Sequence, residues 1–128
     1  MFPALSLRPI LWFDAATCLA MGALLAVAAG PLSAIFGLPL IFLREAGFFL
    51  LIFALFVGWV ATRSNPASGA RLVAGANIAW AVASIALLAT PWTSPTILGV
   101  AFVAVQAGAV SIIALVQLRA SRLAQLPA

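Results

Sequence analysis

Four long apolar runs alternate with short segments rich in glycine, proline and polar residues. Each run holds about 20 mostly apolar residues, the length of a helix that crosses the hydrocarbon core of a bilayer. The pattern predicts an all-α, polytopic membrane protein, a four-transmembrane-helix bundle with a single integral membrane domain over residues 1–128. The predicted spans cover residues 10–29, 40–62, 70–89 and 96–118. Residues 31–39 are expected to be a connector, because Gly30-Pro31 ends the first helical pattern.

The second run has two different faces. At about 100° per residue, one narrow stripe collects small residues together with an arginine. This stripe comprises Arg44, Gly47, Leu51, Ala54 and Gly58, and the opposite stripe comprises Phe42, Phe49, Phe53 and Phe56. Small residues allow another helix to approach closely, whereas phenylalanine suits lipid. We therefore expect the first stripe to pack inside the bundle and the phenylalanine stripe to face lipid or a partner protein.

The composition excludes an ordinary soluble protein. Hydrophobic residues make up 66% of the chain and charged residues only 6%, whereas soluble domains carry roughly 25% charged residues. The net charge is +4, but the arginines lie scattered at the ends of apolar runs and form no basic patch of the kind that binds nucleic acid. The expected partner is therefore the lipid bilayer, and no nucleic acid is expected.

The arginines are distributed unequally between the two sides of the predicted bundle. One side carries Arg8, Arg63, Arg71, Arg119 and Arg122, and the other carries Arg44. By the positive-inside rule the arginine-rich side is cytoplasmic, so both termini are expected in the cytoplasm. Arginine without lysine, alongside abundant alanine, is associated with GC-rich bacterial genomes, which indicates a multi-pass protein of a bacterial inner (plasma) membrane. A signal peptide is the alternative for the first run, but this run is longer than a usual signal core and contains Asp14.

Two sites with ionisable groups are functional candidates, because charge inside a bilayer is costly. Asp14 lies about one turn into the first span, and we expect an ion pair with Arg71 or, as second choice, with Arg63. The alternative is a carboxylate that binds a proton or a cation. Arg44 and Glu45 are adjacent, so they point about 100° apart on a helix and do not face each other. We expect both to reach the interface by snorkelling; the alternative is an anion- or headgroup-binding mouth formed by Arg44.

The remaining polar residues at membrane depth are Asn77, Ser84 and Gln106. We expect them to make interhelical hydrogen bonds worth about 0.6 kcal/mol each, and they are too few to line a polar pore. The chain has one cysteine, Cys18, and no histidine or tyrosine. It therefore offers no thiolate metal cluster, no usual haem ligand and no catalytic set, and we expect no metal, no cofactor and no enzymatic activity.

Several short groups of residues carry a family resemblance. They are Asp14 with Cys18 and Gly22, Gly37-Leu38-Pro39, Arg44 with Gly47, Asn77 with Trp80, and Gln106. In these groups the chain resembles, over nearly its whole length, small four-helix bacterial inner-membrane proteins that have no assigned activity. The size and the position of Asp14 are also similar to the small multidrug resistance transporters, whose essential acid is a glutamate in the first helix. That family is disfavoured because an aspartate replaces the glutamate, tyrosine is missing, and the arginine bias is unlike dual-topology members.

These observations favour an accessory or packing subunit of a larger membrane assembly, associated with other membrane protein subunits or with itself. The alternative is a small oligomeric transporter or lipid-binding carrier that uses Asp14 or Arg44.

Overall fold

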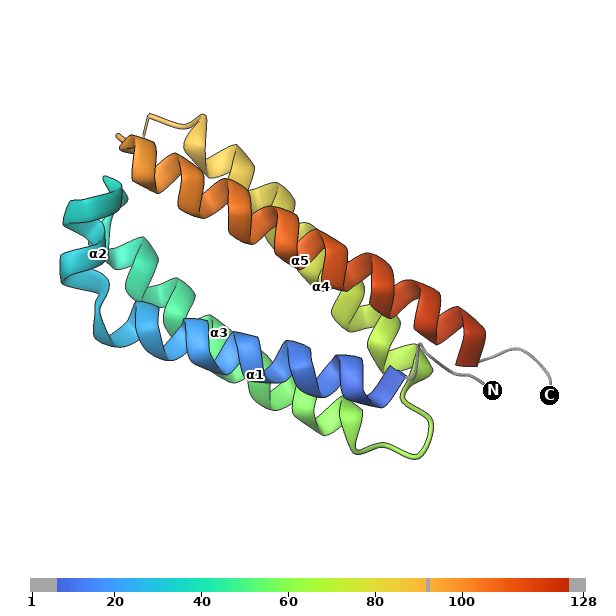
Figure 1. Cartoon of the computed structure of the whole chain (residues 1–128). Helices are drawn as coiled ribbons and strands as arrows, with labels where there is room; N and C mark the ends of the chain where they lie inside the picture. The colour runs from blue at the N-terminus through green and yellow to red at the C-terminus, as the bar shows by residue number, and fades with distance from the viewer. Residues whose placement is uncertain (1–6, 92, 125–128) are drawn as a thin grey trace.

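The computed structural model describes residues 7–91 and 93–124, which form five α-helices (Figure 1). The helices are α1 (Leu7–Val27), α2 (Ala29–Phe36), α3 (Leu40–Ala61), α4 (Ala67–Leu88) and α5 (Ile97–Ala124). Among them, α1, α3, α4 and α5 are long and apolar enough to cross a membrane. The described residues contain no strand. The prediction of an all-α protein with four transmembrane helices is therefore confirmed.

The predicted connector between the first two spans is largely helical. α1 ends at Val27, and α2 begins at Ala29 with Pro31 in its first turn. Proline is tolerated there because the first backbone N–H groups of a helix have no intrahelical partner. α2 ends at Phe36 and is capped by Gly37, whose left-handed φ of 68° lets its N–H donate to the Ser33 carbonyl. Pro31 therefore lies in the first turn of a second helix, where the sequence suggested only the end of the first.

The long helices form two antiparallel pairs, α1 with α3 and α4 with α5, and each pair packs more extensively within itself than against the other (Figure 1). The pairs meet at the end where α1 begins, α5 ends and α3 turns into α4 (Figure 1). A core cluster there draws on all four helices: Leu7, Leu11, Ala15, Val57, Val60, Ala61, Ala67, Ala70, Val73 and Ala120. We call this the arginine end.

The five arginines grouped by the sequence do share this end, and Arg44 with Glu45 lies at the other. Arg8 of α1 donates to the carbonyls of Ala61 and Arg63 at 2.5 and 2.9 Å. Carbonyls at the end of a helix have no intrahelical partner, so Arg8 both caps α3 and holds the α3–α4 turn against α1.

At the opposite end, the segment leading into α5 closes on α2. The backbone N–H of Thr96 donates to the Phe36 carbonyl at 3.0 Å, and the Thr96 hydroxyl donates to the Ile35 carbonyl at 2.7 Å. The Phe36 ring stacks on Phe102 with the centroids 4.6 Å apart. Glycine is required at Gly99, because a Cβ there would collide with the Phe36 carbonyl. The two helix pairs are therefore joined at both ends.

α1 and α3 cross at a pair of glycines. A Cβ at Gly22 would lie 2.9 Å from the Gly47 carbonyl oxygen, and a Cβ at Gly47 would lie 2.5 Å from the backbone nitrogen of Ala26. The two backbones are thus in direct contact, which is the packing that small residues permit between membrane helices. Gly47 faces the inside of the bundle, as predicted.

The inward face of α3 is nevertheless rotated relative to the predicted stripe. It consists of Leu43, Gly47, Leu50, Ala54, Val57, Val60 and Ala61. From the predicted stripe, Leu51 and Gly58 are only half-buried and Arg44 is exposed. In the phenylalanine stripe, Phe53 and Phe56 are half-buried and pack against the core. The prediction was wrong for Phe53 and Phe56, which pack against the core. It was also wrong for Arg44, because an arginine in the first turns of a helix reaches water past the bundle end and does not mark the inward face.

We predict that replacing Gly22 or Gly47 by alanine lowers thermal stability in mild detergent, because the added methyl group pushes α1 and α3 apart. The expected overpacking cost is about 1 to 3 kcal/mol. The control is Gly108→Ala on α5, where a Cβ would have nothing within 4 Å and helix propensity gains at most about 1 kcal/mol. Equal stability of the three variants would contradict the glycine crossing.

Candidate functional site

Asp14 is a carboxylate buried at membrane depth, with only 2% of its surface exposed. Asn77 Nδ2 donates to Asp14 Oδ2 at 2.8 Å, and Gln117 Nε2 donates to the same oxygen at 2.7 Å. Asn77 Nδ2 also donates to Gln117 Oε1 at 3.1 Å. The Cys18 thiol donates to the other carboxylate oxygen, Oδ1, at 3.4 Å. Asp14, Asn77 and Gln117 form a closed triangle of hydrogen bonds, which we call the Asp14 cluster.

Each member of the Asp14 cluster belongs to the buried stripe of a different helix. The stripes are Leu7, Leu11, Asp14 and Cys18 on α1, Ala70, Val73, Ala74, Asn77 and Ala81 on α4, and Val103, Ala107, Ala114 and Gln117 on α5. Each polar residue shares a helix face with apolar or small residues, so it points inward when that face packs in the bundle. The Asp14 cluster therefore links one helix pair to the other.

Gln117 was missed by sequence reasoning, although it is 0% exposed. It lies one residue from the end of the predicted fourth span, where a polar residue is expected at the interface, but α5 continues to Ala124. A signal was present: Gln106 precedes Gln117 by an interval of about three helical turns, which places both side chains within about 20° on one face. That spacing indicates two inward-facing amides on α5.

The Asp14 cluster satisfies the polar groups that it buries. An unpaired polar group in hydrocarbon costs several kcal/mol. Within the described part of the chain, every buried side-chain nitrogen or oxygen has a hydrogen-bond partner. An ionised carboxylate only accepts hydrogen bonds, and the amides of asparagine and glutamine supply the N–H donors. The bundle thus holds Asp14 with neutral donors.

Amides therefore occupy the place beside Asp14 that the sequence assigns to Arg71 or Arg63. Arg71 precedes Asn77 by six positions on α4, which separates them by about 9 Å along the axis and about 120° around it. Arg71 is accordingly exposed. Arg63 lies in the turn after α3, with its guanidinium 4.9 Å from the centroid of the Trp59 ring.

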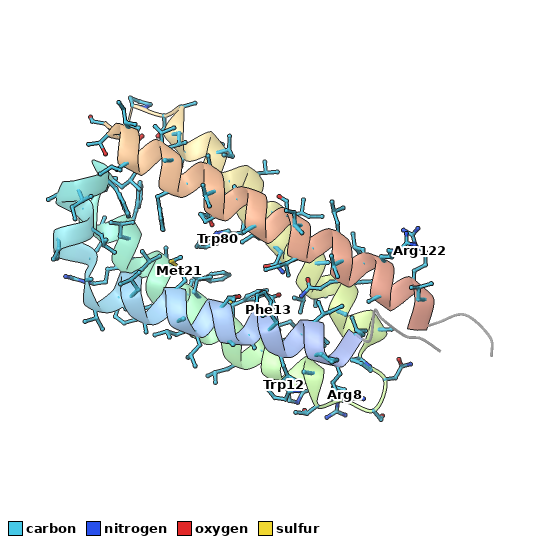
Figure 2. The ribbon with its side chains drawn as sticks, in the orientation of Figure 1. Arg8, Trp12, Phe13, Met21, Trp80 and Arg122 are labelled. Carbon is cyan, nitrogen blue, oxygen red and sulfur yellow. The ribbon has the colours of Figure 1, made fainter. Side chains whose placement is uncertain are left out.

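A cavity of about 670 Å³ lies between the two helix pairs, beside the Asp14 cluster. Figure 2 shows Phe13 and Met21 of α1 and Trp80 of α4 pointing into the space between the pairs. The aromatic wall comprises Phe13, Phe36, Phe49, Phe53, Trp80 and Phe102, and the polar lining residues are Asp14, Thr17, Cys18, Asn77 and Gln106. The cavity opens between α1 and α5, because its lining residues Phe13, Leu98 and Val105 are 60%, 61% and 72% exposed.

A second cavity of about 300 Å³ lies on the side of α3 and α4. Both cavities are lined by Met21, Leu50, Trp80, Phe102 and Gln106. The indole Nε1 of Trp80 donates to Gln106 Oε1 at 3.0 Å, and the Trp80 ring stacks on Phe49 with centroids 5.7 Å apart. Trp80 and Gln106 therefore form a partition between the two cavities, and the expected interhelical hydrogen bond of Gln106 is present.

The other candidate residues from the sequence lie in different surroundings. Asn77 makes the interhelical bonds expected of it, through the Asp14 cluster. Ser84 does not, because its hydroxyl donates to the Trp80 carbonyl of its own helix at 2.7 Å, a common alternative for serine in helices. Arg44 and Glu45 are exposed near the start of α3 and line neither cavity. The structure thus separates them from Asp14.

Among residues 7–91 and 93–124, no three histidine, cysteine, aspartate or glutamate side chains come together to hold a metal ion. No protein-family model, curated protein or solved structure matches the chain.

We predict that Gln117→Leu destabilises the bundle more than Gln106→Leu does. Gln117 is fully buried and donates to a carboxylate, so its loss should cost about 1 to 3 kcal/mol. Gln106 is half-buried and accepts from an indole, so its loss should cost about 0.6 kcal/mol. Thermal unfolding of the two variants in the same mild detergent provides the comparison.

A double-mutant cycle on the same measurement separates the amide partners of Asp14 from the arginine. Combining Asp14→Asn with Gln117→Leu should cost less than the sum of the two single changes, because both act on one hydrogen bond. Combining Asp14→Asn with Arg71→Gln should be additive. Energetic coupling of Asp14 with Arg71, together with additivity with Gln117, would instead support the ion pair expected from the sequence.

Proposed function

We propose that this protein is a small binding protein or carrier for an apolar or amphipathic molecule of the bilayer, which it holds in the larger cavity. The observation that carries the proposal is the apolar cavity of about 670 Å³ with Asp14, Asn77 and Gln106 in its wall. Ligand sites typically measure about 300 to 1,000 Å³, are mainly apolar and aromatic, and contain a few convergent polar groups.

The position of the opening supports a ligand that comes from lipid. The exposed lining residues Phe13, Leu98 and Val105 belong to α1 and α5, on the lateral surface of a bundle whose long helices are apolar enough to span a membrane. An apolar chain can therefore enter sideways from the bilayer. Arg44, the other residue considered for ligand binding, lies outside both cavities, so the carrier hypothesis rests on Asp14.

The accessory-subunit role favoured by the sequence remains a prediction. Stable co-purification with fixed membrane partners in mild detergent would support it. The cavity favours a binding role, since a packing subunit has no need of a space beside a buried carboxylate.

We also propose that the protein resides in a bacterial inner membrane with both termini in the cytoplasm, on the strength of the five arginines at one end of the bundle. A reporter active only outside the cytoplasm should be inactive when fused at Ala128 and active when inserted between α4 and α5. Reporter activity at Ala128, together with no activity between α4 and α5, would show that the protein has the opposite orientation.

Binding can be followed through the fluorescence of Trp80, in a variant that carries phenylalanine in place of Trp12, Trp59 and Trp92. In lipid nanodiscs, bromine-terminated dodecanol should quench Trp80, because the indole lines the cavity. Unbrominated dodecanol should displace the probe and restore the fluorescence. Quenching that no competitor reverses would indicate simple partitioning into the bilayer and would overturn the binding role.

Two matched substitutions on α5 locate the bound probe. Ala109 lines the larger cavity, so Ala109→Phe should fill it and abolish the displaceable quenching. Ala104 is exposed and lines neither cavity, so Ala104→Phe should leave the quenching unchanged. Identical behaviour of the two variants would place the probe outside the cavity.

A further inference from the structure

We propose that the ligand of the larger cavity is an amphiphile with a protonated amine head, and that Asp14 is the counter-ion of that head. This inference rests on the proposed binding role and adds the chemical class of the ligand. The supporting observations are the place of Asp14 along the cavity, the kinds of donors that surround its carboxylate, and the single weak donor at Oδ1.

Asp14 lies at one end of an elongated apolar space. On α5 the lining residues run from Leu98 to Ile113, which corresponds to about 22 Å along the helix axis. Gln117, which bonds Asp14, lies one turn beyond Ile113 towards the arginine end. The apolar wall therefore extends from Asp14 towards α2, a shape that fits a molecule with a head at Asp14 and a long tail beside Phe36.

Among residues 7–91 and 93–124, the hydrogen-bond donors to the Asp14 carboxylate are neutral. The two amides donate to Oδ2, and the thiol of Cys18 donates to Oδ1 at 3.4 Å. A thiol is a weak donor, and the two oxygens of a carboxylate offer about four acceptor sites. Asp14 can therefore accept a further, stronger hydrogen bond at Oδ1 without giving up the bonds of the Asp14 cluster.

Asp14 lines the cavity, and so do Cys18, which bonds its Oδ1, and Asn77, which bonds its Oδ2. Oδ2 already accepts from two amides, whereas Oδ1 accepts only from the thiol, so Oδ1 is the acceptor that this cavity-lining carboxylate can offer to a ligand. A charged donor such as a protonated amine makes a shorter and stronger bond to a carboxylate than a neutral hydroxyl does, and the attraction grows in a site of low dielectric. An anionic head would be repelled there. The sign of the charge and the open acceptor thus select a cationic head.

The test compares dodecylamine with dodecanol at neutral pH, as competitors for bromine-terminated dodecanol in the Trp80 assay. The two competitors share one tail and differ in the head. We expect dodecylamine to displace the probe at about a tenfold lower concentration, the difference between a charged and a neutral hydrogen bond. Equal potency would overturn the amine proposal and leave the binding role standing, whereas failure of both competitors would overturn the binding role itself.

Two charge-removing variants assign the preference to a residue. Asp14→Asn keeps the size of the side chain and should reduce the potency of dodecylamine to that of dodecanol, with dodecanol unchanged. Glu45→Gln removes the same charge at an exposed position outside both cavities, so it should preserve the preference for the amine. An equal loss in both variants would indicate general attraction of the amine to the protein surface and overturn the role of Asp14. The comparison of amine and alcohol on the unaltered Asp14 decides the matter if Asp14→Asn does not fold.

Discussion

A carboxylate buried in a bundle that lipid surrounds needs hydrogen-bond donors, and the arrangement of the helices depends on where those donors are. Asp14 packs beside α3, but the inward face of α3 from Gly47 to Val57 is apolar and offers none. Asn77 of α4 and Gln117 of α5 supply them instead. Apolar contacts alone would favour the meeting of the two helix pairs only weakly, since lipid is as apolar as the helix surfaces. The Asp14 cluster supplies a directional interaction that lipid cannot replace.

The contrast between packing within and between the pairs accounts for the cavity. Within the first pair, Gly22 and Gly47 bring the backbones of α1 and α3 into contact. Between the pairs, aromatic side chains such as Phe49, Trp80 and Phe102 stand where small residues would be needed for close approach. The joints at the two ends, the core of the arginine end and the contact of α2 with the start of α5, fix the pairs at a distance that these rings do not fill. The space between them is therefore a consequence of where glycine and aromatic residues occur in the sequence.

The sequence predicted features that depend on composition along the chain, and it failed where the outcome depends on contacts between distant segments. The four spans, the arginine end and the inward position of Asn77 follow from hydropathy, charge and helical period. The partner of Asp14 could not be predicted in this way, because its two amide donors are 63 and 103 residues away in the sequence. By charge alone, an arginine is the more obvious partner. The predicted inward face of α3 was wrong because Arg44 shares the helical spacing of the glycines but lies near the start of the helix, where its side chain is exposed. Pro31 is compatible with both the end and the start of a helix, and only the packing of α2 against α5 decides between them.

The two oxygens of Asp14 let one residue serve both the fold and a site. Oδ2 receives the amides of the opposite helix pair at 2.8 and 2.7 Å, whereas Oδ1 receives only the thiol of Cys18 at 3.4 Å, on the same helix. A ligand head that bonds Oδ1 exchanges a weak, local hydrogen bond for a strong one and leaves the link between the pairs intact. Had the amides been shared between the two oxygens, ligand binding would compete with the association of the pairs, and each occupied site would cost stability. Because they converge on Oδ2, a cationic head at Oδ1 gives Asp14 a charged hydrogen-bond donor, whereas the donors from the described residues are neutral. Occupation of the cavity by such a ligand therefore stabilises the folded protein.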